Sequence, residues 1–239
     1  MRNLLRADLR RILKRVSIYV WLFLIFVIFF LSALSKDYTA DIIGMEQGVT
    51  SLLGPILVSI PVFLGVYGRE IQAGSMQCVI GRGMSRTKLI LTKYLECVLM
   101  CLFFFFFIWL AFFLRNNVGD AGLTANQNKM LTIFVLFVFI KTCGYFAFTT
   151  FFFFIAWSVA PGIVALLVSA FLMPMLFTML DGFLKTDFSE FYFNGMIDNA
   201  YASIAAGDIG YTLILAIVLY IGGALLLTAL VFRKKEIEF

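Results

Sequence analysis

Long runs of apolar residues alternate with short polar segments along this chain. Runs of at least about 18 apolar residues indicate membrane-spanning helices, because a helix satisfies its own backbone hydrogen-bonding groups within lipid. The runs that meet this length predict six spans, at about Ser17–Leu34, Thr50–Gly68, Leu89–Leu114, Met130–Trp157, Pro161–Leu180 and Tyr211–Phe232. The predicted fold class is an all-α integral membrane protein, with a single transmembrane domain over residues 1–239.

Three further segments predict helices outside the spans. Residues 1–16 place apolar side chains on one helical stripe and basic side chains on another, which is typical of an amphipathic helix at a membrane surface. This pattern fits a basic anchor that fixes topology as well as it fits a contact with a partner. Residues 69–88 predict a cytoplasmic segment with a short helix. Residues 181–210 are rich in Phe and Tyr, and they predict short helices in the outer membrane interface.

The composition and the charge distribution support this topology. The chain is 62% hydrophobic and contains 29 Phe, and its mean hydropathy of +1.00 exceeds what one soluble core absorbs. Lys and Arg gather in the N-terminal tail, in residues 69–93 and at the C-terminus. Because cytoplasmic loops retain positive charge, both ends are predicted to be cytoplasmic. The net charge of +5 therefore reflects topology and attraction to anionic headgroups rather than nucleic-acid binding.

The sequence lacks the groups that intramembrane catalysis and ATP binding require. It contains no His, no Asp falls within a predicted span, and no stretch matches the pattern GxxxxGK[ST]. The four cysteines, Cys78, Cys97, Cys101 and Cys143, have no further ligands for a metal, and we interpret them as small apolar side chains. We therefore expect no catalytic site, no metal and no cofactor on this chain.

Two ionisable residues fall within the predicted spans. Lys141 lies eleven residues beyond Met130, at a depth of roughly 16 Å, near the middle of a ~30 Å hydrocarbon core. Glu96 lies roughly 9 Å from the cytoplasmic end of its span. A lysine at this depth needs a partner or water, so we predict that Lys141 pairs with Glu96 or faces a wet cavity. Such a pair is as compatible with helix packing alone as with a contact to substrate.

The stretch "GRGMSRTKLILTK", residues 81–93, concentrates charge between the second and third predicted spans. The apolar stripe within Glu70–Ile80 predicts one short helix. Gly81 is predicted to cap its C-terminus, and Ser85 is predicted to cap the N-terminus of the next helix. On physical grounds alone, the turn is explained equally well as a topological anchor and as a docking element.

The residues of this stretch follow a particular order along the chain. They are Glu70, Gly74, Ser75, Gly81, Arg82, Gly83, Met84, Ser85, Arg86 and Lys93. This order resembles the cytoplasmic segment of ABC transporter permeases of the type-2 exporter class. In that family a glutamate and a Gly-Thr or Gly-Ser precede a turn that ends in Ser-Arg, and many members have Pro where this chain has Gly83. The basic N-terminus, the six spans and the long external segment also match, so the resemblance covers the whole chain.

The resemblance implies a function and its partners. It implies a homodimer in the bacterial plasma membrane that binds two cytoplasmic ABC ATPase subunits, which would hold ATP and magnesium. The segment from Glu70 to Arg86 would dock into a groove of the ATPase, where Arg82 and Arg86 could meet acidic or backbone acceptors. The implied activity is export of a hydrophobic or amphipathic compound, with an antimicrobial or secreted peptide as the preferred cargo.

An alternative function requires no ATPase. The chain could be a stand-alone membrane immunity protein or a gradient-driven carrier, with Lys141 and Glu96 as its ionic site. The two hypotheses differ in one observable, because only the transporter requires a stable cytoplasmic ATPase partner.

Overall fold

The computed structural model describes residues 2–32, 49–118, 125–185, 192–205, 207 and 211–234, and these form helices joined by short turns. The first half of the chain forms α1 (Arg2–Leu13), α2 (Val16–Ser32), α4 (Val49–Phe63), the π-helix η2 (Leu64–Gly68), α5 (Arg69–Gln72), α6 (Ser75–Gly81) and α7 (Arg86–Val118). The second half forms α8 (Ala125–Ala156), α9 (Val159–Leu167), the π-helix η3 (Val168–Leu172), α10 (Met173–Leu184), α11 (Phe193–Ala205) and α12 (Tyr211–Lys234).

The apolar helices are those of a multi-pass membrane protein. Within the part of the chain that the structure describes, four helices are long and apolar enough to cross a membrane, and they cover Arg86–Leu114, Asn128–Ala156, Val159–Leu184 and Tyr211–Arg233. The helices α1 and α2 meet at an angle of 67° and provide a fifth crossing if they are counted as one broken span. The apolar helix over Gly54–Gly68 is shorter. The all-helical fold is therefore confirmed over the described residues, whereas the six-span layout stays a prediction.

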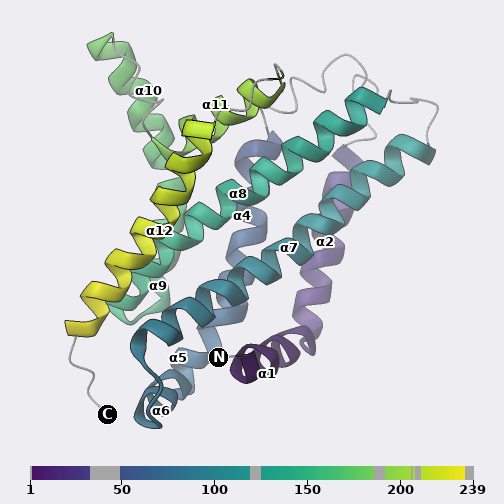
Figure 1. Cartoon of the computed structure of the whole chain (residues 1–239). Helices are drawn as coiled ribbons and strands as arrows, with labels where there is room; N and C mark the ends of the chain where they lie inside the picture. Colours follow the sequence, from purple (N-terminus) through teal and green to yellow (C-terminus); the bar gives the residue numbers. More distant parts are fainter. Residues whose placement is uncertain are drawn as a thin grey trace.

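Helix α8 lies at the centre of the bundle (Figure 1). It contacts α4, α7, α9, α11 and α12, and 67% of its most apolar 18-residue stretch is buried within the bundle, compared with 11% for that of α12. Two glycines allow close packing. A Cβ atom on Gly144 of α8 would lie 2.0 Å from Phe193 of α11, and one on Gly162 of α9 would lie 2.4 Å from Phe63 of α4. The Phe193 ring therefore packs directly against the backbone of α8, and the Phe63 ring packs directly against the backbone of α9.

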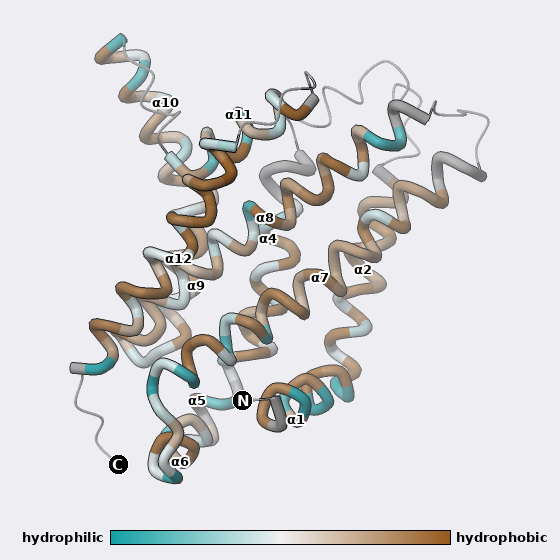
Figure 2. Tube along the Cα trace, viewed as in Figure 1, coloured by the Kyte–Doolittle hydropathy of each residue, from teal (hydrophilic) through white to brown (hydrophobic). Residues whose placement is uncertain are grey.

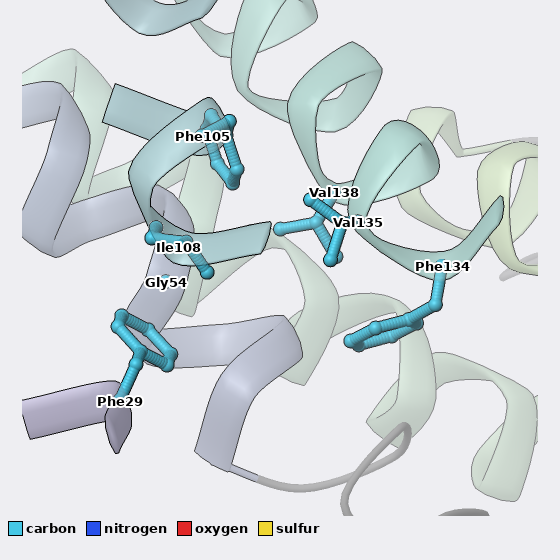
Figure 3. A pocket seen from close by; sticks show the side chains of 7 residues that line it. All are labelled: Phe29, Gly54, Phe105, Ile108, Phe134, Val135 and Val138. Atoms are coloured by element: carbon cyan, nitrogen blue, oxygen red, sulfur yellow. The ribbon is translucent and has the colours of Figure 1, made fainter. Parts of the chain in front are cut away.

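The interior between α2, α4, α7 and α8 is apolar and nearly filled. A cavity of about 10 Å³ lies there. Figure 3 shows the residues that line it, which are Phe29, Gly54, Phe105, Ile108, Phe134, Val135 and Val138. This volume is about that of one water molecule, and no polar group lines it to hold one. Polar residues lie mainly at the two ends of the bundle, as Figure 2 shows. The charged chemistry of the described chain is therefore concentrated at these ends.

Candidate functional site

Segments from three parts of the chain meet at one end of the bundle. Figure 1 shows α1, α5 and α6 there, together with the first turn of α7 and the last turn of α12. The helix α1 contacts both α2 and α7, and α5 contacts α6 and η2. The 69–88 segment, which contains α5, α6 and the turn before α7, therefore lies beside both the first and the last described helices.

A charge cluster with a buried centre joins these elements. It consists of Asp8 and Arg11 of α1, Glu70 of α5, and Lys93 and Glu96 of α7. The Lys93 ammonium donates to Asp8 Oδ2 at 2.7 Å, to Glu70 Oε1 at 2.7 Å and to Glu96 Oε2 at 2.8 Å. Arg11 also donates to the Glu70 carboxylate, and its guanidinium lies 3.4 Å from Asp8 Oδ1. One ammonium group thus holds three helices that are far apart in sequence.

Burial makes this cluster costly to disrupt. The side chain of Lys93 is 1% exposed, that of Glu70 is 4% exposed and that of Glu96 is 0% exposed. Lys93 uses all three donors of its ammonium group, whereas Glu96 Oε1 is buried without a hydrogen-bond partner. Three carboxylate oxygens this close together could hold a metal ion. Here the Lys93 ammonium contacts all three acids, so it supplies the cation that they require.

The 69–88 segment contains two short helices rather than the single helix expected over Glu70–Ile80. The helix α5 ends at Gln72, and α6 begins at Ser75 after Gly74, whose φ of +61° is in the left-handed region. The Ser75 hydroxyl donates to the Glu70 carbonyl oxygen at 3.2 Å and so bridges the break. A residue that requires positive φ interrupts a helix, and this is why the expected helix is divided.

The C-terminal cap of α6 is provided by Gly83 rather than by the predicted Gly81. Gly81 is the last helical residue, and the left-handed residue is Gly83, with φ +91°. The Gly83 N–H donates to the Ile80 carbonyl at 2.9 Å, and the Met84 N–H donates to the Val79 carbonyl at 3.3 Å. These two bonds define a Schellman cap. Because proline has a fixed negative φ and no N–H, this turn explains why the chain carries glycine there.

The predicted N-cap of α7 is confirmed. Ser85 directly precedes the helix, and its hydroxyl oxygen accepts the Lys88 N–H at 3.4 Å. Met84 packs against the core, whereas Arg82 is exposed at the tip of the turn. The turn is thus held by a cap on each side, and it presents a basic side chain outward.

Arg86 contacts the protein's own last helix. Its guanidinium donates to the carbonyl oxygens of Phe232 at 2.7 Å and Arg233 at 3.2 Å, and it lies 5.4 Å above the Phe232 ring. A cation at these carbonyls is favourable because they carry the negative end of the α12 dipole. Arg86 therefore joins α7 to α12, and contacts of Arg82 and Arg86 with an ATPase stay predictions.

The predicted pair between Lys141 and Glu96 is not formed. Lys141 Nζ instead lies 3.4 Å from Asp198 Oδ1 of α11, and Glu96 bonds Lys93. The prediction failed because a helical depth gives the height of a residue but not the direction that its side chain takes. The alternative, in which Lys141 faces a wet cavity, stays a prediction.

Lys93 lies in the stretch that resembles the exporter permeases, but the sequence predicted no site role for it, and it predicted none for Asp8 or Arg11. One signal was present, because Lys93 and Glu96 are three residues apart and so share a helix face. Asp8 was the only acid in the predicted surface helix. Neither observation identifies the shared partner, since Lys93 is 85 residues from Asp8 and 23 residues from Glu70.

No model of a known protein family matches the sequence, and no curated protein matches it. The geometry of this end of the bundle and the resemblance in the 69–88 segment are therefore the features that indicate a function.

Proposed function

We propose that the chain is the membrane-spanning permease subunit of an ATP-driven transporter of the type-2 ABC exporter class. Two copies would span the bacterial plasma membrane six times each, with both ends cytoplasmic, and bind two ATPase subunits. The cargo would be a hydrophobic or amphipathic compound, preferably an antimicrobial or secreted peptide. The chain would carry no catalytic site, because ATP and magnesium belong to the ATPase.

The observation that carries the proposal is the attachment of the 69–88 segment to the bundle. Glu70, the second residue of this segment, is buried and bonds both Arg11 of α1 and Lys93 of α7. A partner that moved α5 and α6 would therefore displace α7 through an ion pair rather than through a slack loop. Such a rigid connection is what a transporter needs if ATP hydrolysis on one subunit is to move helices in another.

The surface of α6 supports docking. Cys78 and Arg82 are exposed, whereas Met76, on the other side of the helix, is 1% exposed and packs into the core. The glycine turn after α6 is fixed by its Schellman bonds. A rigid protrusion loses little conformational freedom on binding, which favours a stable contact.

Cys78 provides a direct test, because the other three cysteines are buried. A photoreactive maleimide is attached to Cys78 in inside-out membrane vesicles that contain the chain and the cytoplasmic proteins of its own cell, including any ABC ATPase. We expect illumination to cross-link the ATPase to the chain. A matched control places the only accessible cysteine at Lys129, which is exposed near the start of α8 at the opposite end of the bundle (Figure 1).

The outcomes separate the two functions. Cross-linking from Cys78 but not from position 129 supports docking of an ATPase at α6. Transport or immunity that persists without any ATPase, together with no cross-link from Cys78, would favour the stand-alone protein. Labelling of Cys78 in right-side-out vesicles would contradict the proposed cytoplasmic orientation.

A further inference from the structure

We propose that the outward face of α1 binds the headgroups of anionic phospholipids. The basic face of α1 consists of Arg6, Arg10 and Lys14, which is the residue that follows the helix. All three side chains are exposed, and their spacing of four residues places them on one stripe. Ile12, which is 0% exposed, and Asp8 of the charge cluster point toward the bundle instead. This inference requires a membrane but does not depend on the transporter proposal.

Acids and bases are segregated at this end of the bundle. Among the described residues, the acids here are Asp8, Glu70 and Glu96, and all three bond the Lys93 ammonium. The exposed charged side chains of the same described region are all basic: Arg6, Arg10, Arg11, Lys14, Arg82, Lys88 and Arg233. Because the acids are turned inward, the cations of the basic face keep their full attraction for an anionic surface.

The depth of the basic face indicates a lipid rather than a soluble acidic protein. The helix α2 begins two residues after Lys14, and its first turns expose apolar side chains, with Val16 76% exposed and Val20 55% exposed. These residues require hydrocarbon, so Lys14 lies within one or two turns of the membrane core. That is the level of the phosphate groups, where Lys and Arg side chains are attracted to anionic lipid.

The direction of α1 is fixed, which keeps the basic face at this level. The helix turns away from α2 by 67°. Arg15 at the bend donates to the Gly65 carbonyl oxygen of η2 at 2.8 Å, and Asp8 is held by Lys93. Because α1 is attached at its middle and just beyond its end, it presents the same stripe to the lipid without an ordering cost on binding.

The test measures lipid selectivity of the full chain in vesicles of phosphatidylcholine. Spin-labelled phosphatidylglycerol and spin-labelled phosphatidylcholine are compared by the fraction of each that is immobilised at the protein. We expect a preference for phosphatidylglycerol that falls by up to about fivefold for each cation removed at low salt, in Arg6→Gln, Arg10→Gln and Lys14→Gln variants and their combination. High salt should weaken the preference of the native chain, because exposed charges are screened.

Two control variants make the outcome specific. The double variant Lys129→Gln/Lys185→Gln removes two exposed cations, one near the start of α8 and one just after α10, at the end of the bundle opposite α1. This variant should keep the preference for phosphatidylglycerol. The variant Arg6→Lys/Arg10→Lys/Lys14→Arg keeps the charge and should also keep it. An unchanged preference in the triple Gln variant, or an equal loss in the Lys129/Lys185 variant, would overturn the proposal.

Competition identifies the source of the phosphate group. Excess inorganic phosphate at matched ionic strength should leave the lipid preference intact, because the proposed ligand is a headgroup held in a membrane surface. Displacement by inorganic phosphate would mean that the face binds free phosphate and would overturn the lipid assignment. Loss of an acidic soluble protein from the triple Gln variant, with no lipid preference in the native chain, would overturn it as well.

Discussion

Replacing Lys93 by methionine tests whether the buried charge cluster holds this end of the bundle together. Methionine fills a similar space but carries no charge, so Asp8, Glu70 and Glu96 would remain with Arg11 as their only cation in the cluster. Each contact of 2.7–2.8 Å contributes about 6 kcal/mol of gross attraction at an effective dielectric constant of about 20.

Desolvation of the ions and repulsion among the three carboxylates offset most of this attraction. Removing one partner from a buried ion pair nevertheless costs about 3–5 kcal/mol, because the remaining charge keeps its desolvation penalty. We therefore expect Lys93→Met to lower the free energy of unfolding by about 3–5 kcal/mol. Unfolding in mixed micelles of a mild detergent and dodecyl sulfate, followed by tryptophan fluorescence, measures this change.

Two further variants make the measurement decisive. Lys88→Met removes an exposed cation from the same helix and should change the free energy of unfolding by less than about 0.5 kcal/mol. Lys93→Met/Glu96→Gln removes both charges of one pair and should recover part of the loss, which a double-mutant cycle quantifies. If Lys93→Met unfolds at the same dodecyl sulfate fraction as Lys88→Met, the cluster does not stabilise the fold.

Three substitutions test the local geometry. Gly83→Pro should abolish the Schellman turn and destabilise far more than Gly83→Ala, which costs about 1 kcal/mol, and limited proteolysis of the turn compares them. Gly144→Ala should destabilise by about 1–3 kcal/mol because its Cβ would lie 2.0 Å from Phe193, whereas Gly54→Ala, with its nearest atoms at 3.7 Å, should stabilise slightly. Equal midpoints for these two alanine variants in dodecyl sulfate would contradict the packing. Arg86→Gln should increase hydrogen exchange in the last turn of α12, and an unchanged exchange rate would show that this contact contributes nothing.

The apolar pattern predicted the helices of the bundle because burial in lipid imposes the same requirement on every residue of a span. The run Leu89–Leu114 lies within α7, and the run Met130–Trp157 coincides with most of α8. The pattern could not predict η2 and η3, since a π-helix has the same composition as the α-helices beside it. It also could not show that the fifth run is divided into α9, η3 and α10.

The candidate site was only partly predictable, for two different reasons. Caps depend on neighbouring residues, so Ser85 was correctly predicted, and the cap of α6 was displaced by only two residues, from Gly81 to Gly83. Ion pairs depend on the rotation of each helix about its axis, which the sequence does not specify. Lys141 was therefore assigned to Glu96 although it lies beside Asp198 of α11.

The orientation of α7 about its own axis determines which charged side chains at this end of the bundle face inward and which face outward. Lys93 and Glu96 lie one turn apart on the side of α7 that faces Asp8 and Glu70, whereas Lys88 is exposed. Because the inward Lys93 ammonium bonds acids from two other helices, the cations of the basic face, Arg6, Arg10 and Lys14, form no ion pair with an acid among the described residues of this end. The same arrangement thus stabilises α5 against α7 and leaves α1 available to the membrane surface. If α7 were rotated by one residue, Lys93 would no longer bond Glu70 of α5 or Asp8 of α1. The attachment of α5 to α7 and the inward position of the acids would then be lost together, so both the proposed docking of a partner and the proposed binding of lipid depend on Lys93.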